Sequence, residues 1–301
     1  MSELNQKIYA QIETWRNRPI EGNHPYVFLD GLWLKRSWGG EVRNVSLLVA
    51  IGVNDEGFRE VLAVAEGAKE DKASWTAFLR HLKERGLKGV RLFVSDKCPG
   101  LVESLGEFYP EAMWQRCTVH FYRTVWTVVP TSRVKEAAAM LKAIHAQEDR
   151  AAARQKAEQV AAKLKEMKLA DAAALVVAGI EETLFYYAFP REHWRCLRTN
   201  NPLGRIMGEV RRRTRAVGAF PDGQVSADAG RGAIAPCGRH EVGITAISRY
   251  EPSRRSEQSS MNARTKTFGS AEGEPSTTRS MPQQMCENSG HYPTNTQQVL
   301  K

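Results

Sequence analysis

The chain changes composition abruptly near residue 225, and that change limits where a hydrophobic core can form. Residues 225–301 contain no tryptophan and a single leucine, Leu300, and they are rich in Ser, Thr, Gln, Asn and Pro. A segment of this kind buries too little apolar surface to offset the entropy that it would lose on ordering. We therefore predict a disordered tail over residues 225–301 and a folded part before it, where all 7 tryptophans lie.

Most of the positive charge also belongs to the folded part. The chain has 43 Lys and Arg against 34 Asp and Glu, which gives a formal net charge of +9. The tail holds only 9 of the basic and 7 of the acidic residues, so most of the excess lies in residues 1–224. Positive charge on a folded part favours a polyanionic partner.

Apolar runs and cysteines exclude several other classes of protein. The longest apolar runs are too short for a membrane span, and no basic and apolar leader opens the chain. The 5 cysteines are too few and too scattered for a disulfide framework or a four-ligand zinc site. We expect a cytoplasmic protein with reduced thiols and no membrane partner.

The hydrophobic pattern of the folded part predicts a mixed α/β fold. The runs that we expect to be strands cover residues 26–34, 45–53, 59–65, 90–95 and 113–117. We expect helices at residues 3–16, 72–85 and 202–213, and a helical block over 120–189 in which 135–168 forms one amphipathic helix. This order predicts helices layered on a mixed sheet, with the helical block inserted before the last helix.

Turn and capping residues support two of these boundaries. The tetrad Asn54-Asp55-Glu56-Gly57 separates two alternating runs, so the second and third strands should form a hairpin. Asp71 is placed to cap the helix that begins at residue 72, and Gly86 to end it.

Two aspartates follow apolar strand-like runs and suggest a metal site. Asp30 follows the apolar run Tyr26–Leu29, and Asp96 follows Leu92–Ser95. If these strands are neighbours, two carboxylates come close together at a buried edge, which a divalent cation would relieve. A pair of Mg²⁺ ions is the usual arrangement for chemistry at a phosphodiester. Alternatively, each Asp is only a turn former or a helix cap.

Longer motifs resemble the mutator-type transposases of bacterial insertion sequences. They are YVFLDGLWLKRSWGGEVRNVSLLVAIGV (26–53), EGAKEDKASWTAFLRHLKERGLKGVRLFVSD (66–96), WQRCTVHFYR (114–123), MLKAIHAQEDR (140–150) and HWRCLRTNNPLGRIMGEVRRRTRAVGAFPDG (193–223). The resemblance covers essentially all of residues 1–224. It implies an RNase H-like core whose Asp-Asp-Glu triad binds Mg²⁺, or Mn²⁺ in its place, cuts transposon ends and joins them to target DNA.

The resemblance makes Asp30 and Asp96 the first two catalytic carboxylates and metal ligands, but the third is missing. Where the family reads Asn-Pro-Leu-Glu-Arg, this chain has Gly204 in place of the glutamate. Glu209 cannot substitute, because five residues along a helix turn it about 140° away. Gly204 and Gly208 each also weaken the helix by about 1 kcal/mol relative to alanine. We predict a degenerate copy with impaired catalysis.

Other residues of the resembling motifs have two possible roles each. Cys117 and His120 match the family's Cys-x-x-His pair and could support the site; alternatively they are a packed thiol and a hydrogen-bonded imidazole, because a closed zinc site needs four ligands. Trp194 could stack on an unpaired base or belong to the core. A basic run could hold DNA phosphates or be a solvated face. It consists of Arg211, Arg212, Arg213 and Arg215.

The two ends of the chain depart from the family. Members carry a longer helical region at the front that binds transposon ends, so residues 1–25 are interpreted as its remnant. Residues 233–243, read one nucleotide forward, are compatible with the family's RLRHVAGTKWG, so we predict that the tail is frameshifted. The remaining predicted segments are a first core part (26–119), the helical insertion (120–198) and a final core helix with its motif (199–224).

Two functions therefore compete. The first is a DNA transposase that acts as a homo-oligomer on terminal inverted repeats and target DNA at the nucleoid. The second is a non-catalytic DNA-binding or dimerising remnant that at most inhibits intact copies. Gly204 favours the second, and the family resemblance favours the first.

Overall fold

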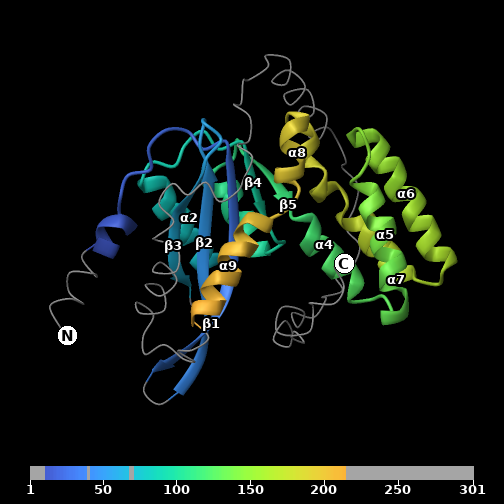
Figure 1. Cartoon of the computed structure of the whole chain (residues 1–301), viewed down its shortest axis with the longest axis horizontal. Coiled ribbons are helices and arrows are strands. Elements are labelled where there is room, and N and C mark those ends of the chain that lie inside the picture. The colour runs from blue at the N-terminus through green and yellow to red at the C-terminus, as the bar shows by residue number, and fades with distance from the viewer. Residues whose placement is uncertain (1–10, 39–40, 68–70, 215–301) are drawn as a thin grey trace, which may run out of the picture. The chain divides into compact units, whose positions relative to one another are not determined.

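A five-stranded mixed sheet lies at the centre of the computed structural model, which describes residues 11–38, 41–67 and 71–214. The strand order is β3-β2-β1-β4-β5 (Figure 1). Neighbours pair antiparallel from β1 to β2 and from β2 to β3, and parallel from β1 to β4 and from β4 to β5. The strands are β1 (Tyr26–Trp38), β2 (Glu41–Val53), β3 (Arg59–Gly67), β4 (Leu92–Ser95) and β5 (Met113–Arg116).

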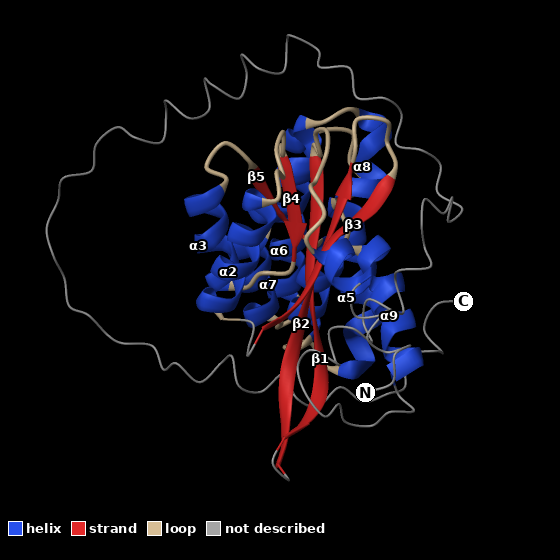
Figure 2. Ribbon diagram, turned by 90° about the vertical axis from the view of Figure 1, so that its left-hand side faces the viewer, coloured by secondary structure: helices blue, strands red, loops and turns tan. Residues whose placement is uncertain are grey.

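The central strand β1 is apolar on both faces, as a strand covered on both sides should be. Phe28 and Leu32 belong to the core on one face, and Val27 and Leu29 to the core on the other. The β1–β2 pair continues past the helices, as Figure 2 shows. Trp33 lies where that cover thins and is 50% exposed.

Helices α2 (Lys72–Glu84) and α3 (Pro99–Phe108) cover one face of the sheet (Figure 2). Asp71 caps α2 as predicted, because its carboxylate accepts a hydrogen bond from the Ser74 N–H at 2.9 Å. Beyond the end of α2, Gly86 has a φ of 101°, a left-handed conformation that glycine adopts easily.

Helix α9 (Asn201–Thr214) lies on the opposite face and follows the shorter α8 (Arg191–Leu197) along the chain (Figures 1 and 2). Leu203, Met207 and Val210 recur at helical spacing, and all are buried in the core that also contains Phe28 and Leu32 of β1. This stripe fixes which side of α9 meets the sheet.

The helices between β5 and α8 have a hydrophobic core of their own. They are α4 (Thr118–Trp126), α5 (Val134–Ile144), α6 (Arg150–Glu166) and α7 (Ala170–Gly179), with the short 3-10 turns η1 (Thr131–Arg133), η2 (Glu181–Thr183) and η3 (Phe185–Ala188). We call α4 to α7 the helical block. Within the part of the chain that the structure describes, no helix is long and apolar enough to cross a membrane.

The prediction of one continuous helix over residues 135–168 is wrong. One helix ends at Ile144 and a second begins at Arg150. Asp149 begins a new helix by accepting the Ala152 N–H at 2.7 Å. The break also places His145 in the interior, where its ring bonds to the Tyr122 hydroxyl at 2.7 Å.

The other expected elements are present, with shifted ends. All five strands form, the hairpin joins β2 to β3, and the last helix begins at Asn201. Residues 11–16 are helical, whereas residues 3–10 of that expected helix and the expected disordered tail at 225–301 lie outside the described residues.

Candidate active site

The pairing of β1 with β4 brings Asp30 and Asp96 into line. Tyr26 pairs with Leu92 and Phe28 with Val94, an offset that positions 30 and 96 continue. Because the two strands are parallel, both positions lie towards the same edge of the sheet, where ligands bind in many α/β proteins. The register therefore supports the expected neighbourhood of the two carboxylates.

Asp30 does not end its strand, contrary to the sequence interpretation. β1 continues to Trp38, and Asp30 pairs with Val49 of β2. Pairing with the other neighbour, β4, ends at Phe28, two residues before Asp30. The half-buried carboxylate accepts the Gly31 N–H at 3.0 Å. Side chains alternate along a strand, so Asp30 shares the face of Phe28, which is the face covered by α9.

Asp96 directly follows β4 and is exposed. Its carboxylate accepts the Lys97 N–H at 2.7 Å. Its negative charge raises the pKa of both the Cys117 thiol and the His120 imidazole, so all three groups share one electrostatic neighbourhood.

Cys117 and His120 stand in this neighbourhood as neutral groups. The Cys117 side chain is buried and its sulfur accepts the Asn200 N–H at 3.2 Å. Burial raises the thiol pKa and lowers the imidazole pKa, in each case because the charged form loses water. The packed-thiol alternative describes Cys117 well. For His120, the ring Nδ1 is buried with no hydrogen-bond partner among the described residues.

No third carboxylate completes the pair in the described part of the chain. No group of three or more His, Cys, Asp or Glu side chains there is arranged to hold a metal ion. Gly204 lies in the first turn of α9, and a Cβ built on it meets nothing within 4 Å. Glu209 is engaged elsewhere, because its carboxylate binds the Arg212 guanidinium at 2.7 and 2.8 Å.

Comparison with known proteins places these residues in a family. Residues 1–228 match the profile of the Mutator family of transposases. The chain belongs to that family. It is 38% identical over 224 residues to the transposase for insertion sequence element IS1081 of Mycobacterium tuberculosis, covering 74% of this chain and 54% of that protein.

Two further transposases show similar relationships. That of insertion sequence element ISRM5 of Rhizobium meliloti is 34% identical over 224 residues, which are 74% of this chain and 56% of the relative. That of IS256 in transposon Tn4001 of Staphylococcus aureus is 33% identical over 236 residues, or 78% and 60%. The chain thus spans somewhat more than half the length of these curated relatives.

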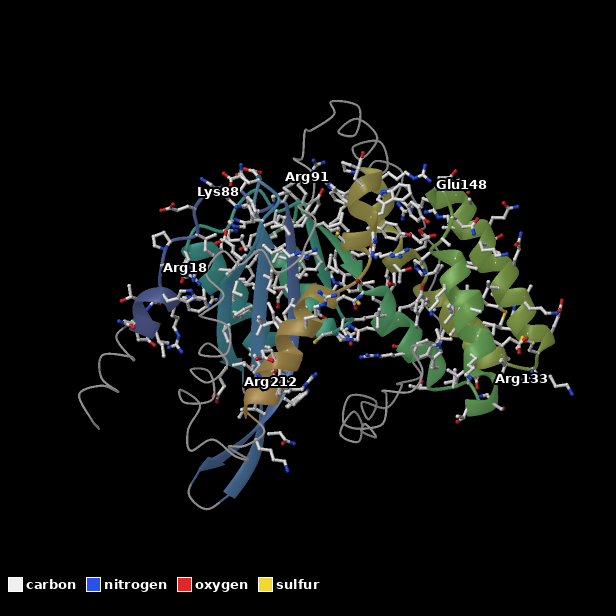
Figure 3. All side chains as sticks on the ribbon, in the orientation of Figure 1. Arg18, Lys88, Arg91, Arg133, Glu148 and Arg212 are labelled. Atoms are coloured by element: carbon white, nitrogen blue, oxygen red, sulfur yellow. The ribbon has the colours of Figure 1, made fainter. Side chains whose placement is uncertain are left out.

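In this Mutator family chain, the residues expected to contact DNA differ in their surroundings. Arg211 and Arg212 are exposed on α9, and Arg212 lies near its far end (Figure 3). The side chain of Arg213 and the whole of Arg215 lie outside what the structure describes. Trp194 is half-buried, and its indole N–H donates to the Phe189 carbonyl at 2.7 Å. These contacts favour the core alternative for Trp194.

Asn200 is a candidate site residue that the sequence analysis missed. It is 3% exposed and directly precedes α9. Its side-chain amide donates to the Leu29 carbonyl at 2.9 Å, one residue before Asp30. The position of an Asn before Asn-Pro is typical of a helix start and could have marked it.

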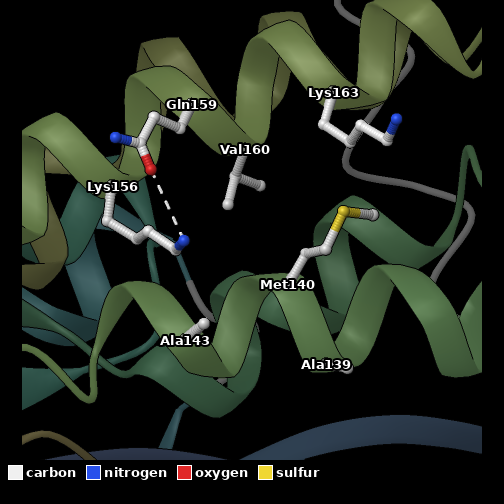
Figure 4. A pocket seen from close by; sticks show the side chains of 7 residues that line it. All are labelled: Ala139, Met140, Ala143, Lys156, Gln159, Val160 and Lys163. Carbon is white, nitrogen blue, oxygen red and sulfur yellow. Dashed lines mark hydrogen bonds between the residues drawn. The ribbon is translucent and has the colours of Figure 1, made fainter.

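A separate groove on the helical block contains none of the predicted site residues. It has a volume of about 320 Å³ and lies between α5 and α6, with Met140 and Val160 facing across it (Figure 4). Lys156 and Lys163 flank its apolar floor. We assign it no part in the chemistry of the two aspartates.

Proposed function

We propose that this chain is a DNA transposase by descent, built on an RNase H-like core, whose Asp30 and Asp96 bind divalent metal but whose catalysis is impaired. The observation that carries the proposal is the β1–β4 register, which aligns the two aspartates in a chain of the Mutator family. The strand order also supports the RNase H-like assignment, since three antiparallel strands are followed by two parallel ones.

The side chains at this edge fit Mg²⁺ or Mn²⁺. Carboxylate oxygens are the ligands that these hard cations prefer. The nearby Cys117 thiol, whose pKa burial raises, is a poor ligand for them. Bound metal would activate the attacking oxygen and stabilise the leaving oxygen of a phosphodiester. Asp30 and Asp96 would position it, with Asp30 partly shielded from water and Asp96 open to the DNA.

The absence of a carboxylate at position 204 is the proposed cause of impairment. A Cβ built at position 204 meets nothing within 4 Å, so a side chain can begin there without a clash. The loss of metal affinity or activity should exceed the 10–100-fold that is typical when a residue next to a metal ligand is changed.

A pair of substitutions tests this proposal. The native chain, Gly204→Glu and Gly204→Gln would be incubated with labelled DNA bearing the terminal repeats of its own element, in Mg²⁺ or Mn²⁺. Glutamine matches glutamate in size and helix propensity but lacks its charge. We expect cleavage only from Gly204→Glu. Robust cleavage by the native chain would refute the impairment, and equal cleavage by both variants would remove the carboxylate from the mechanism.

The competing function is that of a non-catalytic DNA-binding or dimerising remnant, which Gly204 favours. A remnant of this kind would bind DNA with a strong salt dependence and would lower transposition by an intact copy through mixed complexes. Measuring DNA binding across a salt series, together with the mass of the complex, separates it from an inert chain. Salt-independent or absent binding would exclude it.

A further inference from the structure

A chain of hydrogen bonds joins the two strands that carry the aspartates. The Asn200 side chain donates to the carbonyl of Leu29, the residue before Asp30, at 2.9 Å. The Asn200 backbone N–H donates to the Cys117 sulfur at 3.2 Å. The Cys117 N–H in turn donates to the carbonyl of Ser95, the residue before Asp96, at 2.7 Å. Asn200 and Cys117 together therefore bridge the residues immediately preceding both carboxylates.

The same bridge fixes the start of α9. The Asn200 carbonyl accepts the Gly204 N–H at 3.1 Å, which closes the first turn of the helix. Next to it, the Arg198 carbonyl accepts the Thr118 N–H at 3.0 Å, so the chain before α9 is held to the start of α4 at two points. Hydrogen bonds to and around the buried Asn200 thus connect all three positions of the proposed triad, 30, 96 and 204.

We propose that Asn200 and Cys117 are positioning residues that set the spacing of Asp30, Asp96 and position 204. This rests on the proposed function in that the two aspartates are taken to bind metal. Neither residue contacts the metal; each acts through the backbone next to a ligand. Groups that orient ligands in this way typically change metal affinity by about 10–100-fold.

The chemistry of the two side chains fits this role. The Cys117 sulfur is a weak acceptor that stays neutral, because burial raises the thiol pKa. The bridge therefore introduces no charge that would compete with the aspartates for metal. Asn200 Oδ1 is buried with no partner among the described residues, so its amide has acceptor capacity left for a water or another donor.

Gln115 offers a matched control. It is also a fully buried amide, and it bonds to the Thr183 carbonyl at 2.7 Å and to the Tyr186 N–H at 3.1 Å. Those bonds tie β5 to the turns after the helical block and do not reach the residue before either aspartate. Gln115→Ala should therefore cost stability as Asn200→Ala does, without moving the carboxylates.

The experiment measures Mn²⁺ affinity by electron paramagnetic resonance on the full chain, with Asp30→Asn to identify binding at the site. We expect Asn200→Ala and Cys117→Ala to weaken Mn²⁺ binding about tenfold or more. Cys117→Ser, which keeps an acceptor for the Asn200 N–H, should stay within about threefold of the native chain. Gln115→Ala should bind Mn²⁺ like the native chain at a similar loss of Tm. Losses of affinity that merely follow Tm in every variant would overturn the proposal.

A second readout needs no metal. Hydrogen exchange of the Asp30 and Asp96 segments should accelerate in Asn200→Ala and not in Gln115→Ala. If the native chain and Asp30→Asn bind Mn²⁺ equally weakly, the proposed metal site fails. Exchange then decides the positioning role alone: acceleration at both segments supports it, and unchanged exchange at either overturns it.

Discussion

The strand half and the helix half of the proposed site differ in what their residues do for the fold. On β1 and β4, the carboxylates sit beside fully buried neighbours such as Leu29 and Val94. On α9, the buried stripe that contains Leu203 packs the helix against the sheet. A Cβ built on the neighbouring Gly204 meets nothing within 4 Å. Under the proposed function, position 204 is essential to the chemistry, yet it contributes little to packing.

Under the proposed function, this difference explains how a member of the family could lose a catalytic group and keep its architecture. Replacing a solvent-facing glutamate by glycine removes no core contact, so the stability cost is about 1 kcal/mol of helix propensity. Under the proposed function, the same replacement would also remove a metal ligand. Loss of function and loss of fold are therefore separable at α9, and less so on the strands.

The largest expected effect comes from removing a strand carboxylate after the helix has been restored. In the Gly204→Glu chain, Asp30→Asn should lower DNA cleavage more than about 100-fold, because asparagine keeps the shape but not the charge that holds metal. Asp149→Asn is the matched control, since that aspartate only caps α6 and asparagine caps equally well. Equal cleavage by both variants would leave the strand half without a catalytic role.

Neighbouring positions on α9 should respond in opposite directions to alanine. Leu203→Ala should lower the free energy of unfolding by about 2–5 kcal/mol, because the Leu203 side chain is fully buried. Gly204→Ala should raise it by about 1 kcal/mol through helix propensity, with no gain in cleavage. Urea unfolding measures both. A large loss at Gly204→Ala would mean that position 204 packs, and the contrast would be broken.

Acid should destabilise the helical block through a buried histidine. Burial lowers the pKa of His145 to about 4, and the Arg198 guanidinium, which donates to its backbone carbonyl, acts in the same direction. Below about pH 6.5 the unfolded chain takes up a proton that the folded chain refuses until about pH 4. Stability should therefore fall as pH drops through that window, by roughly 3 kcal/mol.

His145→Gln is the test of that acid sensitivity. Glutamine keeps hydrogen-bonding capacity towards Tyr122 and Thr183 but does not titrate, so the loss between pH 6.5 and 4 should shrink. An unchanged pH profile would assign the acid sensitivity to other groups.

The strands could be predicted from the sequence, and the β1–β4 register agrees with the predicted neighbourhood of the two aspartates, which stays a prediction. Alternating apolar and polar residues, or a continuous apolar run, indicate a strand locally, and an aspartate after such a run suggests where the strand ends. Asp30 nevertheless lies inside β1, because the β1–β2 pairing continues where the β4 pairing stops. Where the pairing with each neighbour stops depends on the lengths of β2 and β4, and the local sequence around Asp30 carries no information about them.

Two other features depend on distant contacts and could not be predicted. Asn200 binds a carbonyl 171 residues away, so nothing near it in the sequence announces the bridge. The break after Ile144 interrupts a stretch of strong helix formers, because burying His145 against Tyr122 and Thr183 outweighs local propensity. In both cases tertiary packing decides.

The smallest expected effect concerns the exposed end of α9. Arg212 pairs with Glu209 three residues earlier, and an exposed pair of this kind contributes little to stability. Arg212→Ala should therefore hardly change the free energy of unfolding. If Arg212 contacts a DNA phosphate, the same variant should reduce the dependence of log affinity on log salt by about 0.9.

Glu209→Gln sharpens that test, because it frees Arg212 from its partner without removing the arginine. DNA binding at low salt should then tighten, whereas Arg212→Ala weakens it. The two variants have similar small effects on stability, so a difference between them reports charge at the DNA and not folding. If neither variant changes binding at any salt concentration, this end of α9 is a solvated face that does not contact DNA. The proposed site then extends along α9 no further than Gly204.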